Sequence, residues 1–471
     1  MKDEIPVIGF LRYSREAVEK ALARGEPFHF EEALPTLLDG FLRLAESLGV
    51  LQGFEGLTDP REEGHIPLPV GCAVTMCRFL YALPSFRRVG RILLRDHALL
   101  QRLGMLPVVC EEGYYHCARD DDQDEPDEPH KPFTVESVLD MLNALDLDEV
   151  QELIVTMVQA LRKRQPRLFR RGLFIMDSND FRLKGSGTHY KWCALMLWTP
   201  YGMIPVAMEF SATKGEGTGE TSVGRRVVER ALQAYGEGFI KTLLMDTGYL
   251  DGPGLHWLKY EHGIDWVMDP KEDMKVTESM LSKKDEKPQR PWRLVAPPRL
   301  EMPEKQLPTR KVMWLGEQRG FFTYRAPVNG CVVWDRYPAD KEHPEEYDSY
   351  QVLLTSHLEW SGPQIHDHSR MRWCIESTFG VMTNQWGLGK WEIKRLAVYE
   401  AAILFMALTF GLLVVYLYEE GQPGSLRDVA DRLVRQTKGK MLLVCGRAAM
   451  IVTPAILNDL HGRGLMDRPA P

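Results

Sequence analysis

The chain has 471 residues, of which 44% are hydrophobic and 26% are charged, as in an ordinary soluble globular protein with room for two to four domains. Its formal net charge of −8 argues against a protein that coats nucleic acid over its whole surface. A DNA enzyme is not excluded, because it needs only a local basic surface.

Eight cysteines are scattered along the chain, and residues 1–6 lack the apolar core of a secretory signal. We therefore expect a cytoplasmic protein with free thiols. Four cysteines lie in the first part of the chain without CxxC spacing, which favours buried thiols over a zinc site. They are Cys72, Cys77, Cys110 and Cys117.

Residues 1–118 are predicted to form a helical N-terminal region, because apolar residues recur there at three- and four-residue spacing. One of its helices carries Arg87, Arg88, Arg91 and Arg95 among apolar residues. Such a helix can present cations to phosphates while its other face packs, so we expect this region to bind DNA. A solvated basic face explains the pattern equally well.

Residues 119–133 are an acidic linker by composition, because closely spaced Asp and Glu side chains repel one another and resist packing. The alternative is a segment that mimics nucleic acid and screens a basic groove. Residues 134–171 are predicted to form one helix, Val135 to Arg164, and a basic segment that ends at Arg170 and Arg171. This run of cations favours DNA contact over an idle solvated surface.

Residues 172–270 change to a pattern of alternating strands and helices, and we predict the first part of a ribonuclease-H-like core there. Three strands in a meander are followed by helix, strand, helix and strand. The predicted strands are Leu173–Asp177, Lys191–Thr199, Ile204–Phe210, Lys241–Met245 and Ile264–Met268, and the predicted helices are Ser222–Tyr235 and Gly254–His262.

Residues 271–355 are predicted to be a β-rich insertion, with strands at Lys311–Trp314, Gly320–Tyr324, Cys331–Trp334 and Tyr350–Leu354. Core helices are expected over 356–438, and a C-terminal tail with a weak helical pattern over 439–471.

Within the predicted core helices, Ala401 to Tyr418 contains no charged residue and reaches the lower length limit for crossing a bilayer. Glu400 and Glu419-Glu420 flank it, and neither end carries a basic cluster. A helix buried on all sides in a large core has the same pattern, and we favour it over a membrane span.

Three acidic residues occupy positions that can converge on a metal site. Asp177 and Asp246 each end an apolar strand, and Glu376 lies on a predicted helix. Carboxylates so placed can clamp two divalent ions about 4 Å apart and support cleavage of a phosphodiester. A single Asp after a strand often does no more than cap a turn or a helix, and this explains Asp251 well. Asp180 lacks such an explanation and remains an alternative to Asp177.

The strings Met176-Asp177-Ser178, Met245-Asp246-Thr247-Gly248-Tyr249 and Arg372-Trp373-Cys374-Ile375-Glu376-Ser377-Thr378-Phe379 together resemble the DDE transposases of bacterial insertion sequences. They are similar to the branch whose ribonuclease-H-like core carries a β-rich insertion before the final Glu. The resemblance covers roughly residues 170–415. Where that family has a Tyr and a Lys around the Glu, this chain has Ser369 and Thr383.

The resemblance implies a catalytic, metal-binding triad of Asp177, Asp246 and Glu376, with two Mg²⁺ ions per site and Mn²⁺ able to substitute. It also implies a phosphate contact from Arg372, and we predict further DNA contacts from Tyr249 and Lys390. Aromatic residues of the insertion are available to stack on a flipped base, namely Trp314, Phe321, Phe322, Tyr324 and Trp334.

The expected partners are double-stranded DNA, as terminal inverted repeats and target DNA, and a second copy of the chain, because each of two ends needs a catalytic centre. No membrane partner is expected. The chain is thus predicted to be a transposase that cuts element ends and transfers a 3′-OH strand to target DNA. A metal-dependent nuclease or recombinase on the same core, and a host-adopted DNA-binding protein, are the alternatives.

Overall fold

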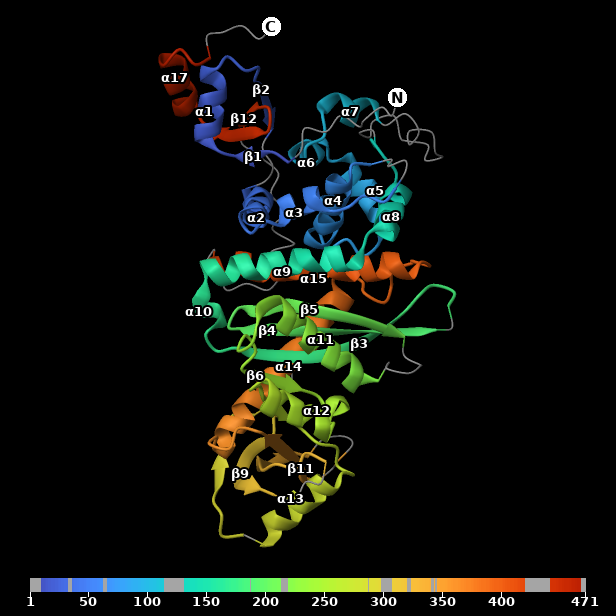
Figure 1. Cartoon of the computed structure of the whole chain (residues 1–471), viewed down its shortest axis with the longest axis vertical. Helices are drawn as coiled ribbons and strands as arrows, with labels where there is room; N and C mark the ends of the chain where they lie inside the picture. The colour runs from blue at the N-terminus through green and yellow to red at the C-terminus, as the bar shows by residue number, and fades with distance from the viewer. Residues whose placement is uncertain are drawn as a thin grey trace. The chain divides into compact units, whose positions relative to one another are not determined.

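The structure is a computed structural model that describes residues 10–32, 36–61, 66–113, 131–186, 188–212, 219–286, 288–297, 307–319, 323–339, 343, 345–419 and 441–466. The described residues fall into two compact units (Figure 1). The first unit comprises those within Met1–Arg164, Arg182–Gly187 and Gly380–Pro471, and the second those within Gln165–Phe181 and Thr188–Phe379.

The second unit is built on a mixed sheet of nine strands, counted over the described residues, in the order β5-β4-β3-β6-β7-β11-β10-β9-β8. These strands are β3 (Leu173–Arg182), β4 (His189–Thr199), β5 (Gly202–Ala212), β6 (Thr242–Met245), β7 (Asp265–Met268), β8 (Trp292–Leu294), β9 (Thr309–Gln318), β10 (Val328–Tyr337) and β11 (Tyr347–Thr355).

The predicted ribonuclease-H-like core is confirmed in the first five strands of this order. Strand β6 pairs in parallel with β3 on one side and with β7 on the other, while β4 and β5 form an antiparallel hairpin. All four residues of β6 are buried, as expected of a strand covered on both faces. Helix α11 (Glu220–Tyr235) packs on β4 and β5, as Figure 1 shows.

The β-rich insertion extends this core sheet. Strands β8 to β11 form an antiparallel meander, and β11 pairs with β7 through Leu354↔Met268 and Thr355↔Val267. The predicted strand at Gly320–Tyr324 is wrong in its last two residues, which lie in a turn, and its first three residues lie outside the described residues. Helix α13 (Lys275–Glu286) contacts β9, β10 and β11.

The remaining helices of the second unit connect these strands. They are α10 (Pro166–Phe169), the short turn η2 (Thr247–Tyr249), α12 (Gly252–His256), the π-helical turn η3 (Trp257–Glu261) and α14 (Gly362–Asn384), whose last residues from Gly380 belong to the first unit.

The first unit is mostly helical, as predicted for its N-terminal part. Its helices are α1 (Arg15–Ala23), α2 (Thr36–Ser47), α3 (Val50–Gly56), α4 (Leu68–Leu80), α5 (Phe86–Ile92), the turn η1 (Leu93–Arg95), α6 (His97–Arg102), α7 (Pro107–Glu112), α8 (Val135–Ala144), α9 (Leu147–Arg164), α15 (Leu396–Glu419) and α17 (Pro454–Gly462). Cys72, Cys77 and Cys110 are buried free thiols, as expected, and Cys117 lies outside the described residues.

The single helix predicted over 135–164 is wrong. Leu145 is extended, with φ of −64° and ψ of 140°, and it ends α8. The side chain of Asp146 then accepts a hydrogen bond from the backbone N–H of Asp148 at 2.8 Å, at the start of α9. An Asp that satisfies a free N–H at a helix start explains the interruption.

Helix α15 is buried on all sides, as predicted, and lies beside α9 in Figure 1. Among the described helices it is the one whose length and apolarity suffice to cross a membrane, and 94% of its most apolar window is buried inside the structure. It contacts α2, α4, α8 and α9. By its contacts, α15 therefore belongs to the core of the first unit.

The two ends of the described chain meet in a four-stranded sheet, which neither the helical N-terminal prediction nor the weakly helical tail of 439–471 anticipated. Its strands, β1 (Arg12–Tyr13), β13 (Ala448–Val452), β12 (Met441–Cys445) and β2 (His29–Glu32), are paired in that order. Gly446, with φ of +54°, provides the tight turn between β12 and β13. Val18 and Leu22 of α1 pack against Leu443 and Met450.

This packing predicts that the N-terminal residues depend on the C-terminal hairpin. We expect Leu443→Ala, which removes a fully buried side chain, to destabilise the small sheet by about 2–4 kcal/mol. Trypsin should then cleave faster within residues 12–24. Met441→Ala on the same strand is the control, since that side chain is 51% exposed. Equal protection of wild type and Leu443→Ala would contradict the expectation.

Candidate active site

Strand pairing brings Asp177 and Asp246 to neighbouring positions. Met176 of β3 and Met245 of β6 are register partners in a parallel pair, so the next residue on each strand is an aspartate. Neighbouring strands lie about 4.8 Å apart. Both carboxyl groups therefore stand at the carboxyl edge of β6, as the sequence predicted.

Glu376 joins this pair through helix α14, and its partner is Arg372 one turn earlier. The Arg372 Nη1 lies 2.9 Å from Glu376 Oε1, and the two side chains are 18% and 32% exposed. Burial raises the pKa of Glu376, which the cation opposes and the charges of Asp246 and Asp269 reinforce. The three predicted acids thus share one electrostatic environment.

The pKa of Asp177 is strongly raised by burial and by its acidic neighbours. Burial raises its pKa to about 6, the charges of Asp246 and Glu376 add to the shift, and the Ser178 N–H and Arg372 oppose it. The Ser178 N–H donates to Asp177 Oδ1 at 2.8 Å. The site therefore holds more negative charge than its own cation neutralises.

Asp269 is a fourth acid that the sequence interpretation missed. It follows β7, whose Met268 is the register partner of Met245. Its Oδ2 accepts a hydrogen bond from Gln351 Nε2 at 3.0 Å, and its backbone carbonyl accepts one from Thr247 Oγ1 at 2.8 Å. Burial raises its pKa, with a further contribution from Asp246. The signal that selected Asp177 and Asp246, an acid directly after an apolar strand, is present here too.

Arg372 is the cation that these four acids share. Although burial opposes it, the charges of Asp269, Glu376, Asp246 and Asp177 raise the pKa of the guanidinium. Within the part of the chain that the structure describes, Glu376 is the acid in direct ion-pair contact with it. Arg372 thus partly neutralises the acids in the metal-free chain.

The donor set suits a hard divalent cation, because carboxylate oxygens are the ligands that Mg²⁺ and Mn²⁺ prefer. Within the described residues, no three His, Cys, Asp or Glu side chains are already arranged around a common ion position. The excess negative charge is the feature that fits a cation. Asp177, Asp246 and Glu376 are the residues placed to hold one.

Asp180, the alternative to Asp177, is exposed three residues further along β3. The pKa values of Asp269, Glu376 and Arg372 respond to the charges of other site residues, and Asp180 is not among the causes. The structure therefore favours Asp177. Asp251 caps α12 as expected, since its Oδ2 accepts the Gly254 N–H at 2.9 Å.

The predicted DNA contact of Tyr249 conflicts with the structure. Its side chain is only 5% exposed, and its hydroxyl shares hydrogen bonds with Ser178 Oγ and Cys193 Sγ. A Cβ on Gly224 would meet the ring at 2.8 Å, so α11 approaches it closely. Tyr249 supports the strand that carries Asp177 and presents no ring face to a base.

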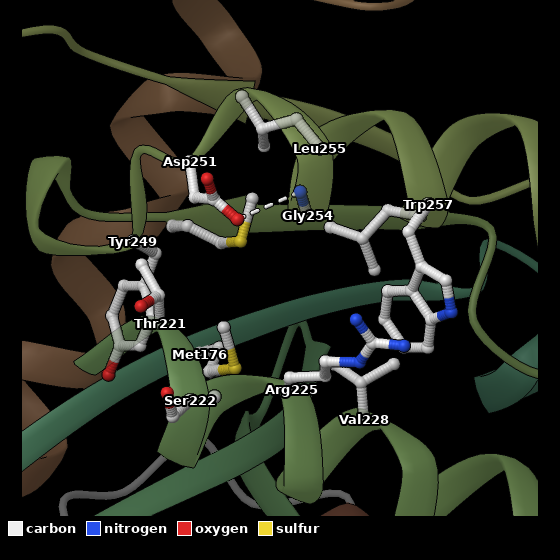
Figure 2. A pocket seen from close by; sticks show the side chains of 13 residues that line it. Met176, Thr221, Ser222, Arg225, Val228, Tyr249, Asp251, Gly254, Leu255 and Trp257 are labelled. Carbon is white, nitrogen blue, oxygen red and sulfur yellow. Dashed lines mark hydrogen bonds between the residues drawn. The ribbon is translucent and has the colours of Figure 1, made fainter. Parts of the chain in front are cut away.

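This tyrosine lines a cavity of about 200 Å³, together with residues of α11, α12, β3 and β6 (Figure 2). Met176 and Met245, which directly precede Asp177 and Asp246, line it. Arg225 lies over the Trp257 ring at 4.5 Å from its centroid. Asp177, Asp246 and Glu376 are not among the residues that line this cavity.

The other predicted DNA contacts lie elsewhere on the surface. Arg170 and Arg171 are exposed after α10, and Lys390 is exposed in the turn after α14, within the first unit. Among the described aromatic residues of the insertion, Trp314 is 46% exposed, while Tyr324 is buried. Lys311 covers Trp334 at 4.8 Å from the ring centroid. Phe321 and Phe322 lie outside the described residues.

Comparison with known families identifies the domain in which these acids lie. The family model of the transposase DDE domain matches residues 169–412, which is more than half of the chain and includes all three acids of the triad. The chain belongs to the DDE transposase domain family. Enzymes of this family are polynucleotidyl transferases that use divalent metal ions, and the predicted transposase resemblance is confirmed at this level.

Among solved structures, a piggyBac transposase synaptic complex with hairpin DNA is similar over 86% of this chain and 82% of that chain, with 11% identity and a TM-score of 0.44. A TM-score this low supports no conclusion about the present DDE transposase. The search of curated proteins finds no match to the chain.

The raised pKa of Asp177 predicts a stability signature. Between the ordinary value of 3.8 and about 6, the native carboxyl retains a proton that the unfolded chain has released, so the free energy of unfolding falls as pH rises through this window. Asp177→Asn removes that loss. In metal-free buffer near pH 7.5 we expect it to raise Tm by about 2–4 °C.

Thermal unfolding measured near pH 5 and pH 7.5 tests this. The gain should shrink at the lower pH, where the wild-type carboxyl is protonated, and Mn²⁺ should stabilise the wild type more than the variant. Asp180→Asn is the matched control and should change little. If Asp177→Asn were no more stable than the wild type near pH 7.5, the charge of Asp177 would not be what destabilises the site.

We also expect Asp269 to contribute to the binding of a divalent ion at this site. Its charge adds to the potential that attracts a divalent ion, so Asp269→Asn should raise the Mg²⁺ concentration for half-maximal stabilisation about tenfold. The measurement is Tm against Mg²⁺ concentration. Asp273→Asn, at an exposed acid four residues later, should leave the titration unchanged. Identical titrations of all three proteins would exclude Asp269 from the ion's environment.

Proposed function

We propose that this DDE transposase cuts the ends of a bacterial insertion sequence and transfers the 3′-OH strand to target DNA. The observation that supports this most is the adjacency of Asp177 and Asp246 on parallel strands, with Glu376 joined to both by their mutual charge. Two Mg²⁺ ions held by these acids, with Mn²⁺ as a substitute, would activate the nucleophile and neutralise the leaving oxygen.

The chain's own residues have distinct parts in this proposal. Burial of Asp177 keeps its carboxyl poorly hydrated, so its charge acts strongly at short range. Arg372 holds Glu376 by one nitrogen, and the remaining donors of its guanidinium are suited to a phosphate oxygen near the cut. Gln351 and Thr247 fix Asp269 beside the site.

DNA is the proposed partner, and basic surface in both units supports it. In the first unit, α5 exposes Arg87, Arg88 and Arg91 while Phe86 and Val89 of the same helix are buried. This is the arrangement predicted for a helix that meets phosphates. In the second unit, Arg170 and Arg171 are exposed beside the first core strand. We also propose a dimer on paired ends, since each end needs its own catalytic centre.

Substitution of one triad acid tests the catalytic proposal. Asp246→Asn should lower excision by about a thousandfold, because several kcal/mol of transition-state stabilisation depend on the bound ions. The assay is excision from a plasmid that carries the gene with its native flanking DNA. Asp251→Asn is the matched control, since the amide oxygen still caps α12.

The outcomes separate the alternatives. Unchanged excision by Asp246→Asn would overturn the triad assignment and favour a host-adopted DNA-binding protein. Wild-type cleavage without joined products, when ends are supplied already cut, would favour a nuclease on the same core. Cleavage and joining that are both lost in Asp246→Asn and kept in Asp251→Asn are the expected result.

A further inference from the structure

A second cavity of the catalytic unit lies away from the acids. It has a volume of about 480 Å³ and is lined by Arg167, Arg170 and Arg171 on one side and by Trp198 and Tyr201 on the other, together with Leu168 and Pro200. No acidic residue lines it. A concave surface that combines arginines with aromatic rings is suited to a ligand that carries both negative charge and a flat π-system.

The three arginines are available to such a ligand. All three are exposed, and within the described residues none of their guanidinium groups forms a salt bridge. Arg171 lies over the Trp198 ring, 5.3 Å from its centroid. Guanidinium groups without carboxylate partners retain their donors for phosphate oxygens.

The backbone around these arginines is held in place. Lys241 Nζ donates to the Arg170 carbonyl at 3.0 Å. Gly172 has φ of +59°, and a Cβ there would meet Lys241 Cγ at 2.6 Å, so the chain turns sharply between the arginines and β3. The positions of the charges are thereby defined before any ligand binds.

The aromatic wall is equally well defined. Tyr201 stands in the turn between β4 and β5 and is 45% exposed. Thr199 Oγ1 accepts a hydrogen bond from the Tyr201 N–H at 3.2 Å and donates to the Gly202 carbonyl at 2.7 Å. This double contact braces the turn that presents the ring, which lowers the entropy cost of stacking.

The cavity is separate from the catalytic acids. Asp177 lies four residues beyond Leu173 along β3, which at about 3.3 Å per residue is roughly 13 Å, and the arginines precede Leu173 in the chain. A group bound here cannot be the phosphate that reacts at Asp177. The cavity therefore takes no part in the chemical step.

We propose that this cavity binds an unpaired nucleotide of single-stranded DNA, with phosphates on the three arginines and the base stacked at Tyr201. Its volume falls within the range of small-ligand sites. A base can stack on a side chain only where it is free of its duplex neighbours, which favours single strands over duplex DNA. The inference rests on the proposed function only in taking DNA as the ligand.

Fluorescence anisotropy in metal-free buffer tests the proposal, with a labelled oligothymidylate of about 20 nucleotides and a random duplex of the same length as probes. Arg170→Gln/Arg171→Gln should weaken oligothymidylate binding about tenfold, and the slope of log K against log salt should fall by about 1.4 for two lost phosphate contacts. Arg24→Gln/Arg336→Gln is the charge-matched control, because both arginines are exposed and paired with acids.

Substitutions of Tyr201 distinguish the contribution of base stacking from that of the phosphate contacts. Tyr201→Ala should weaken oligothymidylate binding about tenfold, in line with 1–3 kcal/mol per stacked base, and leave the salt slope and duplex binding unchanged. Tyr201→Phe should restore binding. Because Tyr201 is exposed in a turn, the fold should survive, and Tm checks this.

Wild-type affinity of the Arg170/Arg171 double variant for oligothymidylate would overturn the proposal. Equal losses for single strand and duplex in Tyr201→Ala would also overturn it, in favour of a site for the duplex backbone. The binding assay is run without metal and needs no catalysis, so it is independent of the triad. A wild type that binds in this way but never cleaves would refute the transposase proposal and leave this site standing.

Discussion

The parallel pairing of β3, β6 and β7 is the constraint on which the catalytic unit depends. Met176, Met245 and Met268 occupy one register row, so the following residues, Asp177 and Asp246 among them, reach the same sheet edge. Backbone hydrogen bonds set this row, and a slip of one residue would turn each acid to the opposite face. The chemistry therefore rests on strand register before it rests on any side chain.

That register creates an electrostatic problem that the fold tolerates. Acids at adjacent strand ends repel one another, and burial adds to the cost of their charge, which is why the pKa values of Asp177, Asp269 and Glu376 are all raised. Arg372 offsets part of this repulsion. Negative charge that the protein leaves uncompensated attracts cations. The same repulsion lowers the stability of the fold, a cost often found at functional sites.

The first unit is organised around a buried helix and not around a large sheet. Its centre is the apolar helix α15, which the N-terminal helices surround, and its edge is a small sheet formed by both ends of the described chain. Segments more than 400 residues apart in the sequence thus share one core, in which Leu22 contacts the cluster around Leu443. Burial of apolar surface explains both features.

The sequence by itself determined the local elements of the catalytic core and predicted its three acids. Apolar runs that end in Asp177 and Asp246, and a helical pattern around Glu376, depend on neighbours a few residues away and are visible without a fold. Only the tertiary structure decided the rest. Asp269 joins the acids, Tyr249 turns inward, the tail at Leu443 becomes a strand, and Trp198 meets Arg171. Asp269 carries the same local pattern as Asp177 and Asp246, but its place beside them depends on strand pairing. The other three depend on partners that packing selects from distant parts of the chain, about which local propensity carries no information.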